Sequence, residues 1–134
     1  MQAKRLKRLM GEGARVILVM EDEDAIAALL RTLLEEEGYT VMLAPNGREG
    51  LRLLREERVD LVMSDTMMPQ VDGREVARAM RADAAYDGIP LVLMSSAGAR
   101  IVTGVPYTAF LTKPFELDTL FARVARLLSE PLRE

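Results

Sequence analysis

The chain has 134 residues, of which 49% are apolar and 29% charged, with a formal net charge of −3. This composition is typical of a single globular domain with a hydrophobic core. There is no cysteine and no histidine, which excludes disulfides, thiolate metal sites and catalysis by Ser–His or Cys–His pairs. Any chemistry must come from carboxylates, hydroxyl groups, lysine and arginine. We find no apolar run long enough for a membrane span and no secretory signal, so we expect a cytoplasmic protein that binds neither membranes nor nucleic acid directly.

The first fifteen residues are basic. They carry Lys4, Arg5, Lys7, Arg8 and Arg15 against Glu12, a local charge of +4 that leaves −7 for the remainder. We interpret residues 1–14 as a basic N-terminal arm, residues 15–130 as one folded domain and residues 131–134 as a C-terminal tail. The arm is either a solvated tail or short helix laid on the domain, or a docking arm for a partner or an acidic surface.

From residue 15 onward, strand-like and helix-like stretches alternate. The predicted strands are 15–20, 39–44, 59–64, 89–95 and 107–112, whose continuous apolar runs indicate burial on both faces. The predicted helices are 25–37, one that opens at Asn46 and runs through Leu54, 73–83, and 116–130. We expect Asp24 and Asn46 to cap two of them, and Gly38 to end the first. The last helix should bury Leu117, Leu120, Phe121, Val124, Leu127 and Leu128.

This order predicts an α/β fold, a doubly wound five-stranded parallel sheet with helices on both faces. In such folds the ligand site lies at the carboxyl ends of the strands, near the point where the strand order reverses. The polar residues that follow strands are Glu21, Asp22, Glu23 and Asp24, then Asp65, then Ser95 and Ser96, and finally Thr112 and Lys113. We expect Asp65 to be exposed at the end of its strand, and Glu23 and Asp24 to belong to the helix start.

Three carboxylates, a hydroxyl group and one ammonium group are therefore expected to converge. Closely packed carboxylates repel one another unless a cation lies among them. Oxygen ligands without histidine or cysteine suit Mg²⁺ or Mn²⁺. A carboxylate beside such a metal and a lysine is a plausible phosphoryl acceptor, because both cations neutralise the developing charge.

The set Glu21-Asp22, Asp65 in DTMMP followed by VDG, Ser95, and Lys113 in KPF resembles the receiver domain of two-component response regulators, over roughly residues 15–130. The resemblance implies a flavodoxin-like, CheY-like fold. It implies that Asp65 accepts a phosphoryl group from a histidine kinase or phosphotransfer protein. The implied metal ligands are Glu21, Asp22, Asp65 and the backbone carbonyl of Met67.

The resemblance also assigns roles to residues around the acceptor. Lys113 would contact the phosphoryl oxygens and Ser95 would move in to hydrogen-bond them, with the Phe110 side chain following as the second switch residue. The peptide bond before Pro114 would be cis. The implied protein is a signalling phosphoacceptor rather than an enzyme, and a monomer or a phosphorylation-dependent dimer.

Several positions depart from the family pattern. Glu21 stands where aspartate is usual, and Phe110 replaces the frequent tyrosine. Met67 and Ala97 occupy the two positions that tune attack of water on the acyl phosphate in the family, and neither side chain can orient a water molecule. We therefore expect slow self-dephosphorylation.

The stretch between Ser95 and Phe110 is about one helical turn shorter than the family norm and contains Gly98, Gly104 and Pro106. We expect the fourth helix to be shortened or replaced by a loop. Its apolar residues Ile101, Val102, Val105 and Tyr107 should cover the core directly or form an altered partner surface.

Phosphorylation is expected to change the affinity of the domain for another protein. As given, the sequence reads as a stand-alone receiver, and a fragment of a longer regulator or hybrid kinase is the other possibility. Two alternatives remain open at this point. One is a pseudo-receiver that binds partners without phosphorylation. The other is an aspartyl-nucleophile phosphatase of the haloacid dehalogenase type, which would need a second aspartate where Met67 stands.

Overall fold

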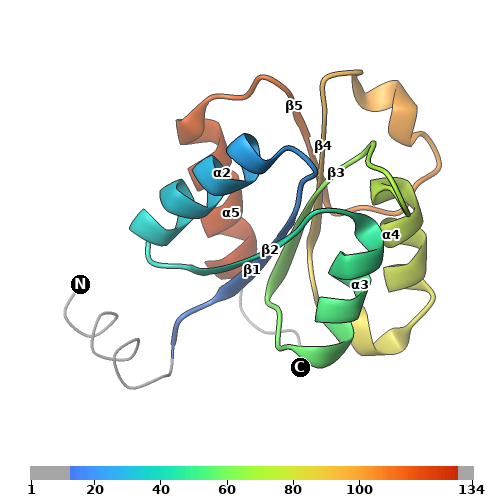
Figure 1. Cartoon of the computed structure of the whole chain (residues 1–134), viewed down its shortest axis with the longest axis horizontal. Helices are drawn as coiled ribbons and strands as arrows, with labels where there is room; N and C mark the ends of the chain where they lie inside the picture. Colours follow the sequence, from blue (N-terminus) through green and yellow to red (C-terminus); the bar gives the residue numbers. More distant parts are fainter. Residues whose placement is uncertain (1–12, 130–134) are drawn as a thin grey trace.

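A computed structural model describes residues 13–129 of the chain, and its centre is one five-stranded sheet (Figure 1). The strands are β1 (Val16–Met20), β2 (Thr40–Ala44), β3 (Leu61–Asp65), β4 (Leu91–Ser95) and β5 (Ala109–Thr112). All neighbours pair in parallel, in the order β2-β1-β3-β4-β5. The predicted fold class is confirmed, although each strand begins one or two residues later than the apolar runs indicated.

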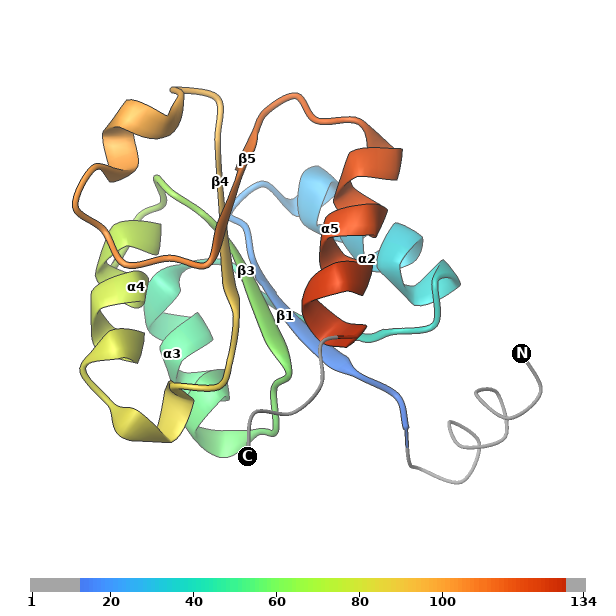
Figure 2. The same ribbon diagram turned by 180° about the vertical axis from the view of Figure 1, so that it is seen from behind.

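Two helices cover each face of the sheet. Helices α2 (Asp24–Glu36) and α5 (Leu117–Ser129) pack on one face, and α3 (Gly47–Glu56) and α4 (Gly73–Arg81) on the other (Figures 1 and 2). The alternation along β1 explains this arrangement, since Ile17 and Val19 point into the first core and Leu18 and Met20 into the second. Apolar side chains on both faces of a strand require a helix layer on each side.

The helix ends follow from local hydrogen bonding. The Asn46 side chain accepts the Glu49 N–H at 2.8 Å, as predicted, and Asp72 forms a complete capping box with Glu75. The prediction that Asp24 caps α2 was wrong. Asp24 is the first helical residue, and the cap position belongs to Glu23, whose side chain makes no capping bond. Gly38 follows α2 with a positive φ of 102°, which suits its predicted role as the helix stop.

The connection between β4 and β5 contains no regular α-helix. Its only helical element is the four-residue 3₁₀ segment η2 (Ala99–Val102), which confirms the prediction that the fourth helix is shortened or replaced by a loop. Val102 and Val105 are buried in the core beneath α3 and α4, and Ile101 and Tyr107 pack against it. Another 3₁₀ segment, η1 (Ala84–Tyr86), follows α4.

The buried stripe of α5 is narrower than predicted. Leu120, Val124 and Leu128 are buried and Phe121 and Leu127 are partly buried, but Leu117, the first residue of the helix, is 45% exposed. Within residues 13–129, no helix combines the length and apolar character needed to cross a membrane. The predicted basic arm, apart from Gly13 and Ala14, and the predicted tail 131–134 lie outside the described residues.

Candidate functional site

The strand order reverses between β1 and β3, and this places acidic residues side by side. The chain leaves β1, forms β2 at the sheet edge and returns to β3 on the other side of β1. Glu21 and Asp22 follow β1 and Asp65 ends β3. One carboxylate oxygen from each of these three residues lies within 4.8 Å of the others. The topology thus produces the acidic cluster that the sequence predicted at this edge.

Lys113 contributes a positive charge from the end of the edge strand β5. It follows β5, and its Nζ lies 2.5 Å from Asp65 Oδ1 and 3.2 Å from Glu21 Oε1. The peptide bond between Lys113 and Pro114 is cis, as the resemblance implied. Four of the residues singled out in the sequence therefore meet in one place.

Burial makes these charges interact strongly. Glu21 is only 2% exposed, and desolvation raises its pKa, with the adjacent Asp65 carboxylate adding to the rise. The backbone N–H of Glu23, which donates to Glu21 Oε2 at 3.1 Å, and the Lys113 ammonium act in the opposite direction. For Lys113, burial lowers the pKa, but its contacts with Asp65 and Glu21 outweigh this and raise it. Lys113 is therefore charged at neutral pH.

The donor set fits a divalent cation. With all groups ionised, three carboxylates and one ammonium leave two uncompensated negative charges in a largely buried cluster. Carboxylate oxygens are the ligands that Mg²⁺ and Mn²⁺ prefer. Asp22 is exposed, so the cluster opens to solvent on its side. These residues are thus able to hold a divalent metal, with Asp22 at the entrance.

Asp65 is less accessible than expected. It was predicted to be exposed, but it is the last residue of β3 rather than the residue after it, and its exposed fraction is 7%. The segment behind it is tightly packed. Thr66 is fully buried and donates from both its N–H and its Oγ1 to the Met94 carbonyl, at 2.8 and 3.0 Å. The backbone that carries the carboxylate is therefore held in position.

Sequence reasoning missed two residues that support this geometry. A Cβ atom at Gly73 would lie 2.2 Å from the Asp65 carbonyl oxygen, so only glycine lets α4 begin so close to β3. The VDG triplet carried that signal, since glycine directly after a helix cap often marks a close approach. Thr66 gave no such signal, because nothing in the sequence distinguishes a buried threonine after a strand from an exposed one.

The remaining predicted site residues surround the cluster. Ser95 ends β4 and is 7% exposed, and its Oγ accepts the Ala97 N–H at 2.9 Å. Phe110 lies on β5 opposite Leu93 and is half-buried; its ring centroid is 6.1 Å from that of Tyr107, at an interplanar angle of 54°. The Met67 side chain is 59% exposed. No described contact joins the Ser95 hydroxyl to Asp65, so its expected movement stays a prediction.

The comparison with protein families decides the class of this fold. Residues 17–125 match the response regulator receiver domain family. The chain belongs to that family. Receiver domains are the signalling domains of two-component systems, and neither the haloacid dehalogenase alternative nor the pseudo-receiver is favoured.

Individual relatives agree with this assignment. The receiver domain is 40% identical over 116 residues to the response regulator MprA of Mycolicibacterium vanbaalenii, covering 84% of this chain and 49% of that protein. The chain spans about half the length of the curated relatives it matches.

Solved structures are similar over nearly their whole length. One is the receiver domain of a signal transduction histidine kinase from Syntrophus aciditrophicus, with a TM-score of 0.82 and 34% identity, covering 90% of this chain and 98% of that one. Another is the response regulator TrrA of Thermotoga maritima in complex with Mg²⁺ and BeF, with a TM-score of 0.77 and 32% identity, covering 85% and 99%.

Proposed function

We propose that this receiver domain accepts a phosphoryl group on Asp65 and thereby switches a protein–protein interaction. The observation that carries the proposal is the contact of Lys113 Nζ with both Asp65 and Glu21, inside the cluster that Asp22 completes. A carboxylate held between an ammonium group and a divalent-metal site is suited to phosphoryl transfer, because both cations stabilise charge on the transferring oxygens. The Mg²⁺ complex of TrrA supports the same reading.

The proposed step is a direct phosphoryl transfer. A carboxylate oxygen of Asp65 forms a bond to phosphorus, while the bond from phosphorus to the donor breaks and its electron pair leaves with the donor atom. With a histidine kinase or phosphotransfer protein, that atom is an imidazole nitrogen. Lys113 would hold one oxygen of the arriving group, which releases part of its present contact with Asp65.

The other side chains prepare the acceptor. We assign Glu21, Asp22, Asp65 and the backbone carbonyl of Met67 as ligands of Mg²⁺ or Mn²⁺, which when bound would neutralise charge on the phosphoryl oxygens. Glu21 is positioned by the Glu23 N–H and by Lys113. Ser95 would exchange its bond with the Ala97 N–H for one to a phosphoryl oxygen, and Phe110 would follow into the space vacated.

We propose that the partners are a histidine kinase or phosphotransfer protein upstream and an output protein or fused output domain downstream, working in the cytoplasm. The match to this chain covers only 49% of MprA, which supports an output domain in the whole regulator. Whether the switched domain is a monomer or dimerises on phosphorylation stays a prediction.

Acetyl phosphate tests the proposal without the cognate kinase. The domain is incubated with Mg²⁺ and acetyl phosphate, and its intact mass is measured beside that of Asp65→Asn and of Asp87→Asn, a matched change at an exposed aspartate distant from the cluster. We expect one added phosphoryl group on the unmodified domain and on Asp87→Asn, and none on Asp65→Asn. Continuous release of phosphate without a labelled protein would favour the phosphatase, and no reaction at all would favour the pseudo-receiver.

A further inference from the structure

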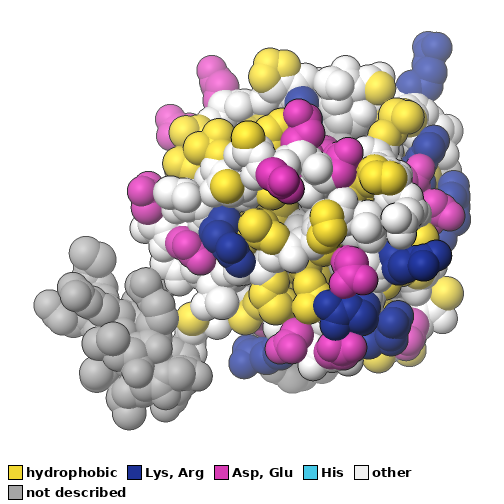
Figure 3. Space-filling model, viewed as in Figure 1, with side chains coloured by type: hydrophobic (Ala, Val, Ile, Leu, Met, Phe, Trp, Pro, Cys, Tyr) yellow, Lys and Arg dark blue, Asp and Glu magenta, His cyan; other side chains and the backbone are white. Residues whose placement is uncertain are grey.

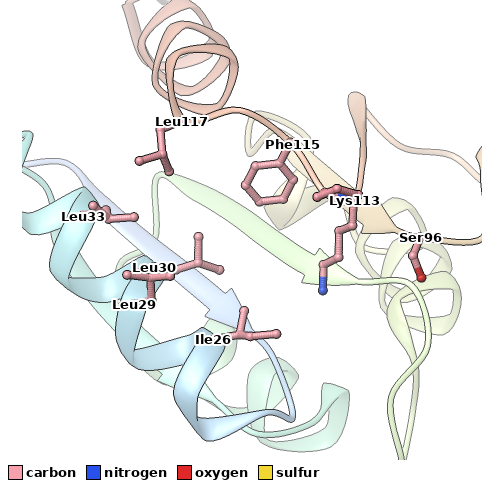
Figure 4. A pocket seen from close by; sticks show the side chains of 9 residues that line it. Ile26, Leu29, Leu30, Leu33, Ser96, Lys113, Phe115 and Leu117 are labelled. Carbon is pink, nitrogen blue, oxygen red and sulfur yellow. The ribbon is translucent and has the colours of Figure 1, made fainter.

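An apolar groove lies next to the acidic cluster and has no covering element among the described residues. It runs between α2 and the start of α5, with a volume of about 400 Å³, and Lys113 lines one end of it (Figure 4). Its apolar lining includes Ile26, Leu29, Leu30, Leu33, Phe115 and Leu117. Leu29 is 57% exposed and Leu117 is 45% exposed, which is unusual for leucines that flank a groove.

The groove is bordered by a strongly acidic segment. Residues 21–37, which contain the whole of α2, hold seven carboxylates and a single basic residue, Arg31. Three of these carboxylates, Glu35, Glu36 and Glu37, crowd the carboxyl end of the helix, where no basic residue occupies the last turn. The helix dipole is negative at that end, so cations should be favoured there. Figure 3 shows hydrophobic and acidic side chains intermingled on this side of the molecule.

We propose that the basic arm of this same chain, residues 4–10, covers the groove. Its sequence, KRLKRLM, combines apolar side chains, which complement the apolar groove, with basic side chains, which complement the acidic rim. Leu6, Leu9 and Met10 would pack against the exposed leucines, and the four basic side chains would face the carboxylates of α2. The arm carries a local charge of +4, whereas the rest of the chain carries −7.

The chain enters the domain close to the end of the groove that is formed by the carboxyl end of α2. The Arg15 carbonyl accepts the Thr40 N–H at 2.9 Å, and the Tyr39 N–H bonds to the Leu34 carbonyl at 3.2 Å. Residue 15 is therefore adjacent to the carboxyl end of α2. Gly13 has a φ of 82°, a conformation in which glycine turns the chain without strain.

The arm is long enough to cover the groove. Leu33 lies about 5 Å along the helix from its last residue, and Ile26 about 10 Å further. An extended chain spans roughly 3.3–3.6 Å per residue, so residues 4–13 span up to about 33–36 Å, more than twice the length of α2 from its last residue back to Ile26. A second copy of the chain or another protein has apolar residues to offer too, but the tethered arm is present at a far higher effective concentration.

An arm docked in the groove would lie close to the acidic cluster. Lys113 and Ser96 both line the groove, so a docked arm would lie beside the lysine that contacts Asp65. The docking itself does not depend on the proposed phosphoryl transfer, and it is tested without it.

The absence of cysteine from the chain allows a direct cross-linking test. A cysteine pair is introduced at Met10→Cys and Thr32→Cys, since Thr32 is exposed on α2 but does not line the groove. A second pair joins Met10→Cys to Arg78→Cys on α4, on the other face of the sheet. We expect rapid intramolecular disulfide formation with Thr32→Cys and at least tenfold slower formation with Arg78→Cys.

Two further variants separate docking from mere proximity. Reversing Lys4, Arg5, Lys7 and Arg8 to glutamate keeps the tether but removes the charge match, and should slow the Thr32→Cys cross-link about tenfold. Leu29→Glu, at an exposed position, should do the same. Equal cross-linking at the two positions, insensitivity to both variants, or cross-links only between two molecules would overturn the proposal. The last outcome would point to a second copy as the occupant.

Discussion

The acidic edge and the β4–β5 connection are built on different principles, although both flank the carboxyl ends of the same strands. The acidic edge takes its residues from the ends of β1, β3 and β5, and hydrogen bonds or ion pairs hold Glu21, Asp65 and Lys113 in place. The connection has only the 3₁₀ segment η2, and Val102 and Val105 hold it by burial in the core. The acidic residues are positioned by the strands. The segment that covers the sheet between β4 and β5 can therefore differ without moving them.

The largest effect is expected from removing the positive charge of Lys113, which disrupts the acidic edge and leaves the β4–β5 connection unchanged. In Lys113→Met, the Asp65 and Glu21 carboxylates lose their shared ammonium group, and we expect labelling by acetyl phosphate to slow about a hundredfold. The rate is measured by intact mass over time. Arg55→Met, at an exposed position on α3, is the control and should leave the rate unchanged. An equal rate in Lys113→Met would contradict a role for the lysine in the transfer.

The converse experiment weakens the connection and leaves the acidic edge alone. Val102→Ala removes apolar volume from a side chain that is 2% exposed, and should lower the free energy of unfolding by about 2 kcal/mol. Arg100→Ala, on the exposed side of η2, should change it by less than about 0.5 kcal/mol. Urea unfolding of both variants provides the values. Similar small effects in the two would mean that this segment does not cover the core.

The lifetime of the phosphoryl group tests the surroundings of the acceptor. With the apolar residues Met67 and Ala97 in place, we expect the modification to persist well beyond seconds after the donor is removed. Met67→Asn places a polar group at a side chain that is 59% exposed, and should shorten the lifetime roughly tenfold by orienting a water molecule. Met67→Leu keeps the side chain apolar and serves as the control. A lifetime of only seconds in the unmodified domain, with Mg²⁺ present, contradicts the prediction.

The smallest effect concerns how the free energy of unfolding of the metal-free domain depends on pH. The pKa of Glu21 is raised above its ordinary value of 4.5, chiefly by burial, so the folded state binds this proton more tightly than the unfolded state does. The resulting stability is fully present below pH 4.5 and is lost as the pH rises through the raised pKa.

Glu21→Gln should remove that part of the pH dependence. Urea unfolding in the presence of a chelator, at several pH values upward from 4.5, gives the comparison. The control is Asp87→Asn, which removes an exposed carboxylate on the far side of the molecule. In this variant the free energy of unfolding should change with pH as it does in the unmodified domain. If the free energy of unfolding of Glu21→Gln changes with pH as it does in the unmodified domain, the pKa of Glu21 does not differ between the folded and unfolded states.

The sequence predicted the outline of both regions. Asp65, Asp22 and Lys113 could be placed because parallel strands end at one edge, and buried strands have continuous apolar runs. The loss of the fourth helix followed from Gly98, Gly104 and Pro106, which disfavour a helix interior.

Details that depend on exact packing were missed or wrong. Asp24 was predicted as the cap of α2, but Asp24 and Glu23 are both acidic residues suited to a helix start, and only the backbone decides between them. Leu117 fits the apolar stripe of α5, yet as the first residue of the helix it is 45% exposed. The backbone of Asp65 is fixed by the bonds of Thr66 to Met94 and by the close approach of α4, neither of which periodicity predicts.

The most direct test of the central claim is to locate the phosphoryl group chemically. An acyl phosphate is reduced by borohydride, which converts a phosphorylated aspartate to homoserine. After treatment with acetyl phosphate and Mg²⁺, reduction and peptide mass analysis, we predict homoserine at position 65. Homoserine at another aspartate, such as Asp22, or its absence in a protein that has gained the phosphoryl mass, would contradict the assignment of Asp65 as the acceptor.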